Sequence, residues 1–196
     1  LYDIAQSDTK SNMGFTTLLY EYNEPFIYNA GTGTYQDYTD MFHEFGHYVN
    51  YYYTQSDLLF GASDNDLSEL QSQGMEMLFT YYYEDIFGKA YANTIRDYIL
   101  LSMVFSVVDG ALYDEFQQRV YAEKDLTPQR VDEIFAQLYE EYGYEPYDGY
   151  EQEWMGISHN FDSPFYYISY AVSALGALEI YDLCQEDFQA GVDQYL

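Results

Sequence analysis

Positively charged residues are scarce in this sequence. Six Lys and Arg residues stand against 34 Asp and Glu residues in a chain of 196, and the formal net charge is −28. Nucleic acids and anionic membranes are both polyanionic surfaces, and proteins that bind them present clustered Lys and Arg. We therefore expect neither nucleic acid nor a membrane among the partners of this chain.

Cysteine is scarce too, since Cys184 is the single one. One cysteine excludes an intrachain disulfide and a zinc site built from several thiolates. We therefore expect a reduced, cytoplasmic location, although an exported protein without disulfides has the same composition.

Long hydrophobic runs are missing as well. The longest uncharged stretch, residues 163–178, is too short and too polar to span a bilayer, and we expect no signal peptide.

Apolar residues are nonetheless plentiful. Hydrophobic residues make up 48% of the chain and aromatic residues 21%, which is enough for a packed core and far more than a disordered acidic tail contains. The length predicts one domain over residues 1–196, or one large piece of a longer chain. We interpret most of the 27 tyrosines as packing residues whose hydroxyl groups reach the solvent.

The periodicity of the chain predicts a mainly α fold with a small antiparallel β element near the N-terminus. Residues 14–20 and 25–29 are rich in strand formers. Thr34, followed by Asp37, predicts the N-cap of a helix over about residues 35–53. Four more helical patterns follow: one from Leu67, one over residues 91–108 with a continuation to about 123, one over residues 127–143 with Pro128 at its first position, and one from Asp162 or Ser163 to about Leu183.

Two of the three histidines lie in the sequence His43-Glu44-Phe45-Gly46-His47, an HExxH pattern within the first predicted helix. Residues i and i+4 share a helix face, so both imidazoles can reach one metal ion. Glu44 lies at the edge of that face and can act on an attacking water without binding the metal. Zinc suits imidazole and carboxylate ligands and makes a bound water acidic. The pattern therefore predicts a catalytic zinc site.

A catalytic zinc requires a third protein ligand. No further histidine follows at the spacing of an HExxHxxGxxH pattern, which leaves a carboxylate on a nearby helix. Glu69 and Glu76 lie two turns apart on one face of the second predicted helix. Asp64 and Asp66 stand at the start of that helix, where acidic residues usually complement the helix dipole. The spacing alone leaves Glu69 and Glu76 both open as ligands.

Four stretches together resemble one enzyme family. They are DMFHEFGHYVN at residues 40–50, ELQSQGME at residues 69–76, HNFDSPFYYISYA at residues 159–171, and LYDI with Lys10, Gly14 and PFIYNAGTGT before the first helix. These stretches resemble the thimet oligopeptidase and oligoendopeptidase F family of zinc peptidases. The resemblance implies a zincin-like helical catalytic domain that uses Zn²⁺ to hydrolyse oligopeptides.

The resemblance also implies a role for each matching residue. His43, His47 and Glu69 would bind the metal, and Glu44 would act as the general base. Glu76 would orient a ligand histidine. His159, with one or two of Tyr166 and Tyr170, would donate hydrogen bonds to the oxyanion. Tyr166 and Tyr170 are four residues apart and would share one face of the last helix, with Tyr167 off that face and His159 on the loop before it.

Members of this family are much longer than this chain. The resemblance therefore implies that residues 1–196 are the C-terminal catalytic portion and that an N-terminal region of the same polypeptide forms the other wall of the cleft. Two alternatives stay open. One is another HExxH enzyme of the gluzincin kind, such as an aminopeptidase, and the other is a non-catalytic acidic helical fragment with an incomplete cleft.

Overall fold

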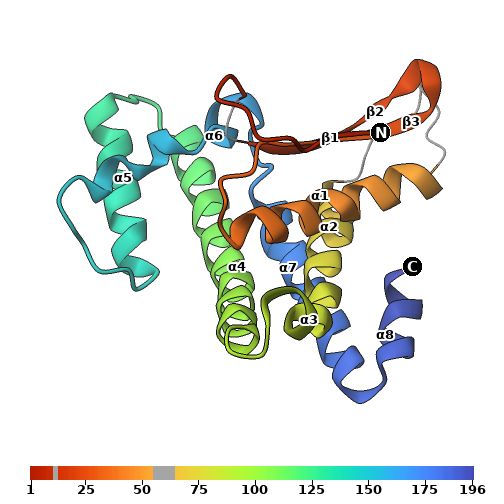
Figure 1. Cartoon of the computed structure of the whole chain (residues 1–196). Coiled ribbons are helices and arrows are strands. Elements are labelled where there is room, and N and C mark those ends of the chain that lie inside the picture. The colour runs from red at the N-terminus through yellow and green to blue at the C-terminus, as the bar shows by residue number, and fades with distance from the viewer. Residues whose placement is uncertain (11–12, 55–64) are drawn as a thin grey trace. The chain divides into compact units, whose positions relative to one another are not determined.

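The structure is a computed structural model that describes residues 1–10, 13–54 and 65–196. Most of these residues are helical, with a small sheet near the N-terminus (Figure 1), which confirms the predicted fold class. The chain divides into two compact units. The first unit comprises Leu1–Leu100 and Ser173–Leu196, and the second comprises Leu101–Val172. A single catalytic domain over residues 1–196 stays a prediction.

The strands are β1 (Tyr2–Asp3), β2 (Gly14–Leu19) and β3 (Glu24–Asn29). The helices are α1 (Gln36–Tyr53), α2 (Asn65–Phe79), α3 (Tyr83–Phe87), α4 (Ala92–Ala122), α5 (Pro128–Glu141), α6 (His159–Asp162), α7 (Ile168–Glu186) and α8 (Phe188–Tyr195), with short 3₁₀ turns at Tyr20–Tyr22 (η1), Thr80–Tyr82 (η2) and Tyr150–Gly156 (η3). No helix in the described ranges is both long enough and apolar enough to cross a membrane.

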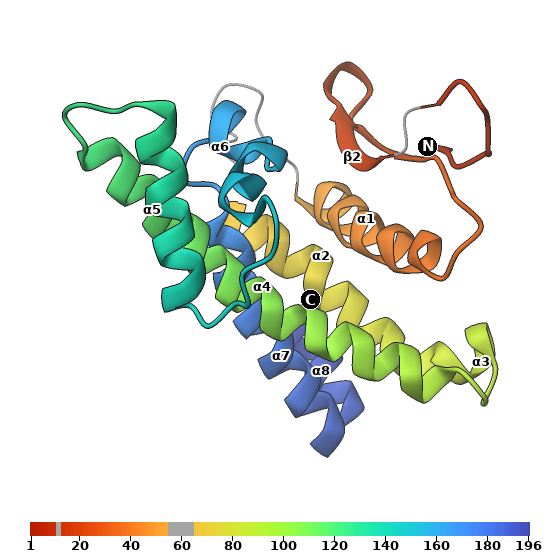
Figure 2. The same cartoon turned by 90° about the vertical axis from the view of Figure 1, so that its left-hand side faces the viewer.

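The sheet has the strand order β1-β3-β2 and lies along α1 (Figures 1 and 2). β2 and β3 pair antiparallel, as predicted, with Gly14 opposite Asn29 and Leu19 opposite Glu24. β1 adds a parallel strand, with Tyr2 opposite Ile27. A two-residue parallel strand has no local sequence signal, because its partner lies far along the chain. The predicted element is therefore present, but it is not purely antiparallel.

The start of α1 differs from the prediction that Thr34 caps it. The N-cap position is Tyr35, and no side chain caps the helix there. Instead the carboxylate of Asp37 reaches back and accepts hydrogen bonds from the backbone N–H groups of Thr32, Gly33 and Thr34, at 2.6, 2.6 and 3.2 Å. Desolvation raises the pKa of Asp37, but the hydrogen bonds lower it by more, so the pKa of Asp37 is lowered. The acidic residue, rather than the hydroxyl, fixes the entry into the helix.

Helices α1 and α2 cross in backbone contact at Gly46. A Cβ atom at this position would lie 2.4 Å from the carbonyl oxygen of Gln71 and 2.5 Å from the Cα atom of Ser72. Such distances are too short for any side chain, so only glycine allows this approach. Near the other end of the crossing, the rings of Phe42 and Phe79 stack with centroids 3.9 Å apart. This close packing brings the polar face of α1 against α2.

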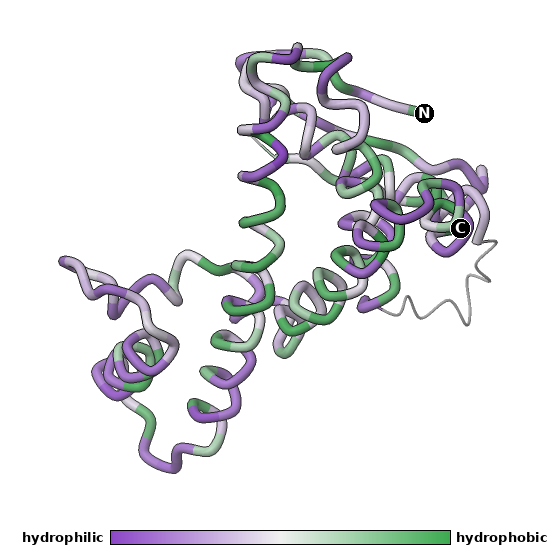
Figure 3. The backbone as a smooth tube through the Cα atoms, turned by 90° about the horizontal axis from the view of Figure 1, so that it is seen from below, coloured by the Kyte–Doolittle hydropathy of each residue, from purple (hydrophilic) through white to green (hydrophobic). Residues whose placement is uncertain are grey.

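The second unit has its own core between α4 and α5. Its buried residues are Leu112, Tyr113, Phe116, Val131, Ile134, Phe135 and Leu138. Hydrophobic and hydrophilic residues are mixed along α5 (Figure 3), as expected for a helix with one buried face. Thr127 caps α5 by accepting from the N–H of Arg130, and Pro128 holds the first position, as predicted.

The last predicted helix begins later than the sequence suggests. Residues His159–Asp162 form the separate short helix α6, and α7 begins at Ile168 rather than at Asp162 or Ser163. Phe165 has a positive φ of 62°, which interrupts any helix through this segment. Tyr166 therefore lies outside α7, and His159 lies on a helix rather than on a loop.

Candidate active site

The two histidines of the HExxH pattern lie one turn apart on α1, and Glu69 approaches them from α2. Glu69 Oε2 is 3.4 Å from His43 Nε2 and 3.7 Å from His47 Nε2. One possible ligand atom from each of the three residues lies within 4.8 Å of the others. Glu69 itself is buried, with 4% of its surface exposed. The crossing of α1 and α2 thus brings two imidazoles and one carboxylate to a single point.

These three residues fit a zinc ion. Ligand atoms about 2.0–2.1 Å from a tetrahedral zinc lie roughly 3.3–3.4 Å from one another. The two measured nitrogen–oxygen distances, 3.4 and 3.7 Å, are within a few tenths of an ångström of that value. Two imidazoles and a carboxylate are also a ligand set typical of catalytic zinc, in which three protein ligands leave one position for water or substrate.

The other imidazole nitrogens have partners of their own. His43 Nδ1 is 2.8 Å from Glu76 Oε1, and His47 Nδ1 is 3.3 Å from Ser68 Oγ. Contacts of this kind fix the ring orientation of a metal-binding histidine. Spacing had left Glu69 and Glu76 open, and the structure places Glu69 at both Nε2 atoms and Glu76 at the far side of one ring. Asp64 lies outside the described residues.

The pKa values of the two histidines shift in opposite directions. Burial alone lowers the pKa of His43, but the hydrogen bonds and charges of Glu69 and Glu76 raise it to about 10. Burial and the neighbouring charge of His43 lower the pKa of His47 to about 4. The carboxylates therefore make this a strongly cation-attracting point in the interior of the first unit.

Glu44 lies next to His43 on α1 and is buried, with 8% of its surface exposed. The Oγ1 atom of Thr16, on β2, lies 2.8 Å from Glu44 Oε2 and 2.8 Å from the backbone oxygen of Glu44. Burial raises the pKa of Glu44, and the hydrogen bond from Thr16 partly opposes this. A carboxylate held in one orientation and with a raised pKa is suited to take up a proton.

Thr16 is a partner of Glu44 that was not predicted from the sequence. The signal was available in the strand pattern, because residues two apart point to the same face of a strand. Thr16 contacts Glu44, a Cβ atom added at Gly14 would lie 3.4 Å from the Glu44 side chain, and Leu18 on the same face is buried. A hydroxyl on the face of β2 that covers the HExxH helix is thus a candidate partner for Glu44.

The remaining predicted residues meet in the second unit. His159 Nε2 lies 3.4 Å from the hydroxyl of Tyr170, and the ring centroids of His159 and Tyr166 are 5.1 Å apart. Tyr166 and Tyr170 are neighbours, at 5.5 Å between centroids, although they do not share one helix. Tyr167, expected to point away, also packs against His159 at 5.6 Å. The structure therefore gathers the predicted imidazole and both phenols in one cluster.

Comparison with protein-family profiles matches the chain to Peptidase family M3 over residues 2–196. Two solved structures cover the whole chain: "PZ PEPTIDASE A with inhibitor 2", with 25% identity and a TM-score of 0.89, and a putative oligoendopeptidase F, with 26% identity and a TM-score of 0.87. A putative oligoendopeptidase F from Bacillus anthracis str. Ames, at 23% identity and a TM-score of 0.81, also shares the fold over the whole chain. No curated protein sequence matches the chain.

The matched structures are much longer than this chain. It covers 36% of the first two and 33% of the third.

Proposed function

This chain belongs to Peptidase family M3, and from that premise we propose that it is the catalytic portion of a zinc-dependent endopeptidase that hydrolyses oligopeptides. The membership confirms the predicted resemblance and supports peptidase activity. The observation that carries the zinc proposal is the position of Glu69 Oε2, 3.4 and 3.7 Å from the Nε2 atoms of the two HExxH histidines.

In this proposal His43, His47 and Glu69 hold the zinc ion. Bound zinc supplies Lewis acidity, which makes water acidic near neutral pH and polarises a peptide carbonyl. Glu76 accepts a hydrogen bond from Nδ1 of His43 and so keeps Nε2 free as a ligand atom. Ser72 Oγ lies 3.1 Å from Glu69 Oε2 and helps to orient that carboxylate.

Glu44 is the proposed general base. One of its carboxylate oxygens takes a proton from the attacking water, and the same carboxyl later gives the proton to the nitrogen of the leaving amine. One water is consumed and one peptide bond is cleaved. Thr16 keeps Oε2 of Glu44 in place through its 2.8 Å contact, which leaves the second carboxylate oxygen for the water.

His159, Tyr166 and Tyr170 are proposed as donors to the negative charge that develops on the carbonyl oxygen. A phenol can donate one hydrogen bond while staying protonated near neutral pH. The 3.4 Å contact between His159 and Tyr170 supports a shared role. The N-terminal region of a longer polypeptide is the proposed second wall of the cleft, because the matched structures are much longer. A cytoplasmic location stays a prediction.

Metal analysis together with peptide cleavage tests the proposal. We expect one zinc per chain, lost in His43→Ala, and cleavage of peptides blocked at both ends, measured on this chain and on the longer polypeptide. Glu44→Gln should retain zinc and lose about 10²–10⁴-fold in kcat, since an amide cannot take up the proton.

Other outcomes would contradict the proposal in distinct ways. Cleavage only of peptides with a free amino terminus would indicate an aminopeptidase. Failure to take up zinc after reconstitution would indicate an inert fragment, and turnover of Glu44→Gln near the wild-type value would remove Glu44 from the mechanism.

A further inference from the structure

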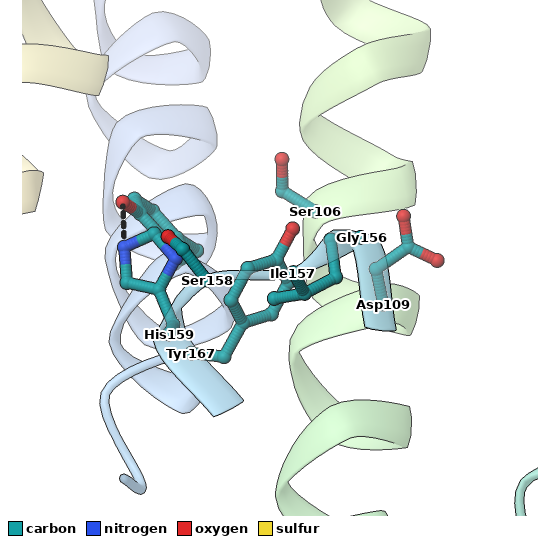
Figure 4. A pocket seen from close by; sticks show the side chains of 8 residues that line it. Ser106, Asp109, Gly156, Ile157, Ser158, His159 and Tyr167 are labelled. Atoms are coloured by element: carbon teal, nitrogen blue, oxygen red, sulfur yellow. Dashed lines mark hydrogen bonds between the residues drawn. The ribbon is translucent and has the colours of Figure 1, made fainter. Parts of the chain in front are cut away.

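The second unit contains a pocket of about 370 Å³ that extends from His159 to Asp109. Figure 4 shows Ser106 and Asp109 on α4 at one side of this pocket and His159 at the other, with Tyr167 also lining it. Tyr170 is part of the same lining. The volume falls in the range of pockets that bind small ligands or side chains. The pocket therefore places a carboxylate in the same space as two proposed oxyanion donors.

Asp109 is half-buried, and no basic side chain forms an ion pair with its carboxylate in the described residues. The hydroxyl of Tyr144 donates a hydrogen bond to its Oδ1 atom, yet burial still raises the pKa of Asp109. A second acid, Glu153, lines an adjoining pocket with Asp109. Burial raises the pKa of Glu153 first, and the charge of Asp109 raises it further. The two acids thus repel each other in a partly desolvated place.

The arginines of this unit bind other acids. Arg119 pairs with Glu115 and Glu141, at 2.5 and 2.6 Å, and Arg130 pairs with glutamates at positions 123 and 133. Neither arginine forms an ion pair with Asp109 in the structure. Lys124, the remaining Lys or Arg of this unit, lines neither pocket. A cation from outside the chain would therefore relieve the repulsion between Asp109 and Glu153.

The rest of the lining also suits a cation on a carbon stem. The ring of Tyr167 and the side chain of Ile157 offer apolar surface to methylene groups. Tyrosine rings also attract an ammonium or guanidinium group, and the hydroxyl of Ser106 can accept a hydrogen bond from it. The pocket thus combines a carboxylate, a hydroxyl and aromatic surface, which together fit a lysine or arginine side chain.

We propose that this pocket binds a lysine or arginine side chain of the peptide substrate and that Asp109 determines this specificity. The inference rests on the proposed function, which places His159 and Tyr170 against the substrate. A substrate that contacts these two residues has a neighbouring side chain within reach of the pocket that they line. The enzyme then prefers peptides with a basic residue at one fixed position from the cleaved bond.

A cleavage assay with matched peptides tests the specificity. The substrates are internally quenched peptides, blocked at both ends, that carry lysine, arginine, norleucine or glutamate at each position in turn. At one position kcat/KM for the basic peptides should exceed that for norleucine on the order of 10–100-fold, as expected for a hydrogen bond to a charged group. Asp109→Asn should remove most of this preference, so that kcat/KM for the basic peptides falls to about that for the norleucine peptide with the same variant.

Asp114→Asn is the matched control. Asp114 lies on the same helix and is half-buried, but its carboxylate binds Gln118 and it does not line the pocket. The variant removes one negative charge from a strongly acidic chain, as Asp109→Asn does. It therefore distinguishes an effect of the pocket carboxylate from an effect of the net charge of the chain. The preference should survive in Asp114→Asn. Equal loss of preference in both variants, or a wild-type enzyme without any preference for basic residues, would overturn the proposal.

A binding measurement keeps this inference separable from the proposed function. Fluorescence anisotropy of a labelled lysine peptide and its norleucine counterpart, titrated with Glu44→Gln, reports binding without turnover. Tighter binding of the lysine peptide, abolished by adding Asp109→Asn, supports the pocket even if cleavage fails. Equal binding of both peptides together with normal cleavage by the wild type would refute the pocket and leave the peptidase proposal intact.

Discussion

Replacing Gly46 by alanine tests whether the contact between α1 and α2 builds the metal site. The added Cβ would lie 2.4 Å from the carbonyl oxygen of Gln71 and 2.5 Å from the Cα atom of Ser72. An ordinary contact needs about 3.4 Å, so the helices must separate by roughly 1 Å, because backbone atoms cannot rotate away as a side chain can. Overpacking of this kind typically costs about 1–3 kcal/mol, while alanine recovers up to about 1 kcal/mol of helix propensity.

The geometric effect is larger than the effect on stability. Glu69 lies on α2, within one turn of this contact, whereas both ligand histidines lie on α1. Metal sites tolerate errors of about 0.2 Å in their ligand distances, so a shift of roughly 1 Å removes the carboxylate from bonding range. We expect Gly46→Ala to fold with a reduced melting temperature and to bind zinc more weakly by about 100-fold or more.

Competition with a chromogenic chelator measures the zinc affinity, and thermal unfolding with and without zinc measures the stability. Gly156→Ala is the control, because a Cβ atom there meets nothing within 4 Å, and both readouts should match the wild type. If Gly46→Ala bound zinc as tightly as the wild type, the backbone contact would not determine the ligand geometry.

Three further variants test other parts of the structure. Thr16→Val should lower kcat roughly 10-fold with KM and zinc content unchanged, and Thr16→Ser should restore kcat, because the hydroxyl orients the general base. Thr17→Val, on the other strand face, should behave as wild type, and equal effects of the two valine variants would exclude an orienting role for Thr16. Tyr170→Phe should lower kcat by about 10²–10³-fold with little change in KM, whereas the exposed Tyr121→Phe should not, and similar kinetics for the two would disprove the oxyanion role. Asp37→Asn should lower the melting temperature at pH 7, because the pKa of Asp37 is lower in the native state and its carboxylate stabilises the fold above the unfolded pKa of about 3.9. The difference in melting temperature from wild type should vanish as the pH falls through the native pKa, and a difference that persisted in acid would refute the electrostatic explanation.

The sequence predicted the features that depend on local spacing. HExxH is a local pattern, and helix periodicity located α1, α2, α4 and α5 to within a few residues. Spacing alone could not choose between Glu69 and Glu76 as the third ligand, because both lie on one helix face and the choice depends on where α1 crosses α2; the family resemblance predicted Glu69. The later start of α7 depends on the backbone of Phe165, which its residue type does not predict.

Long-range contacts account for the other differences. The parallel pairing of β1 joins residues far apart in the sequence, and Thr16 becomes relevant only when β2 packs on α1. Thr34 was the predicted cap of α1, but Asp37 binds the backbone N–H groups there. A carboxylate can accept from several N–H groups at once, whereas a hydroxyl reaches fewer.

The proposed ligands come from two helices, with two on α1 and one on α2. An ion held by all three is then a cross-link between these helices, comparable to a short covalent bridge. Ion binding adds to the stability of the helix pair by mass action, by about 2.7 kcal/mol when the free metal is at 100 times its dissociation constant. A chelator should therefore loosen α1 and α2 as well as inactivate the site, and faster amide hydrogen exchange in these two helices would reveal that loosening.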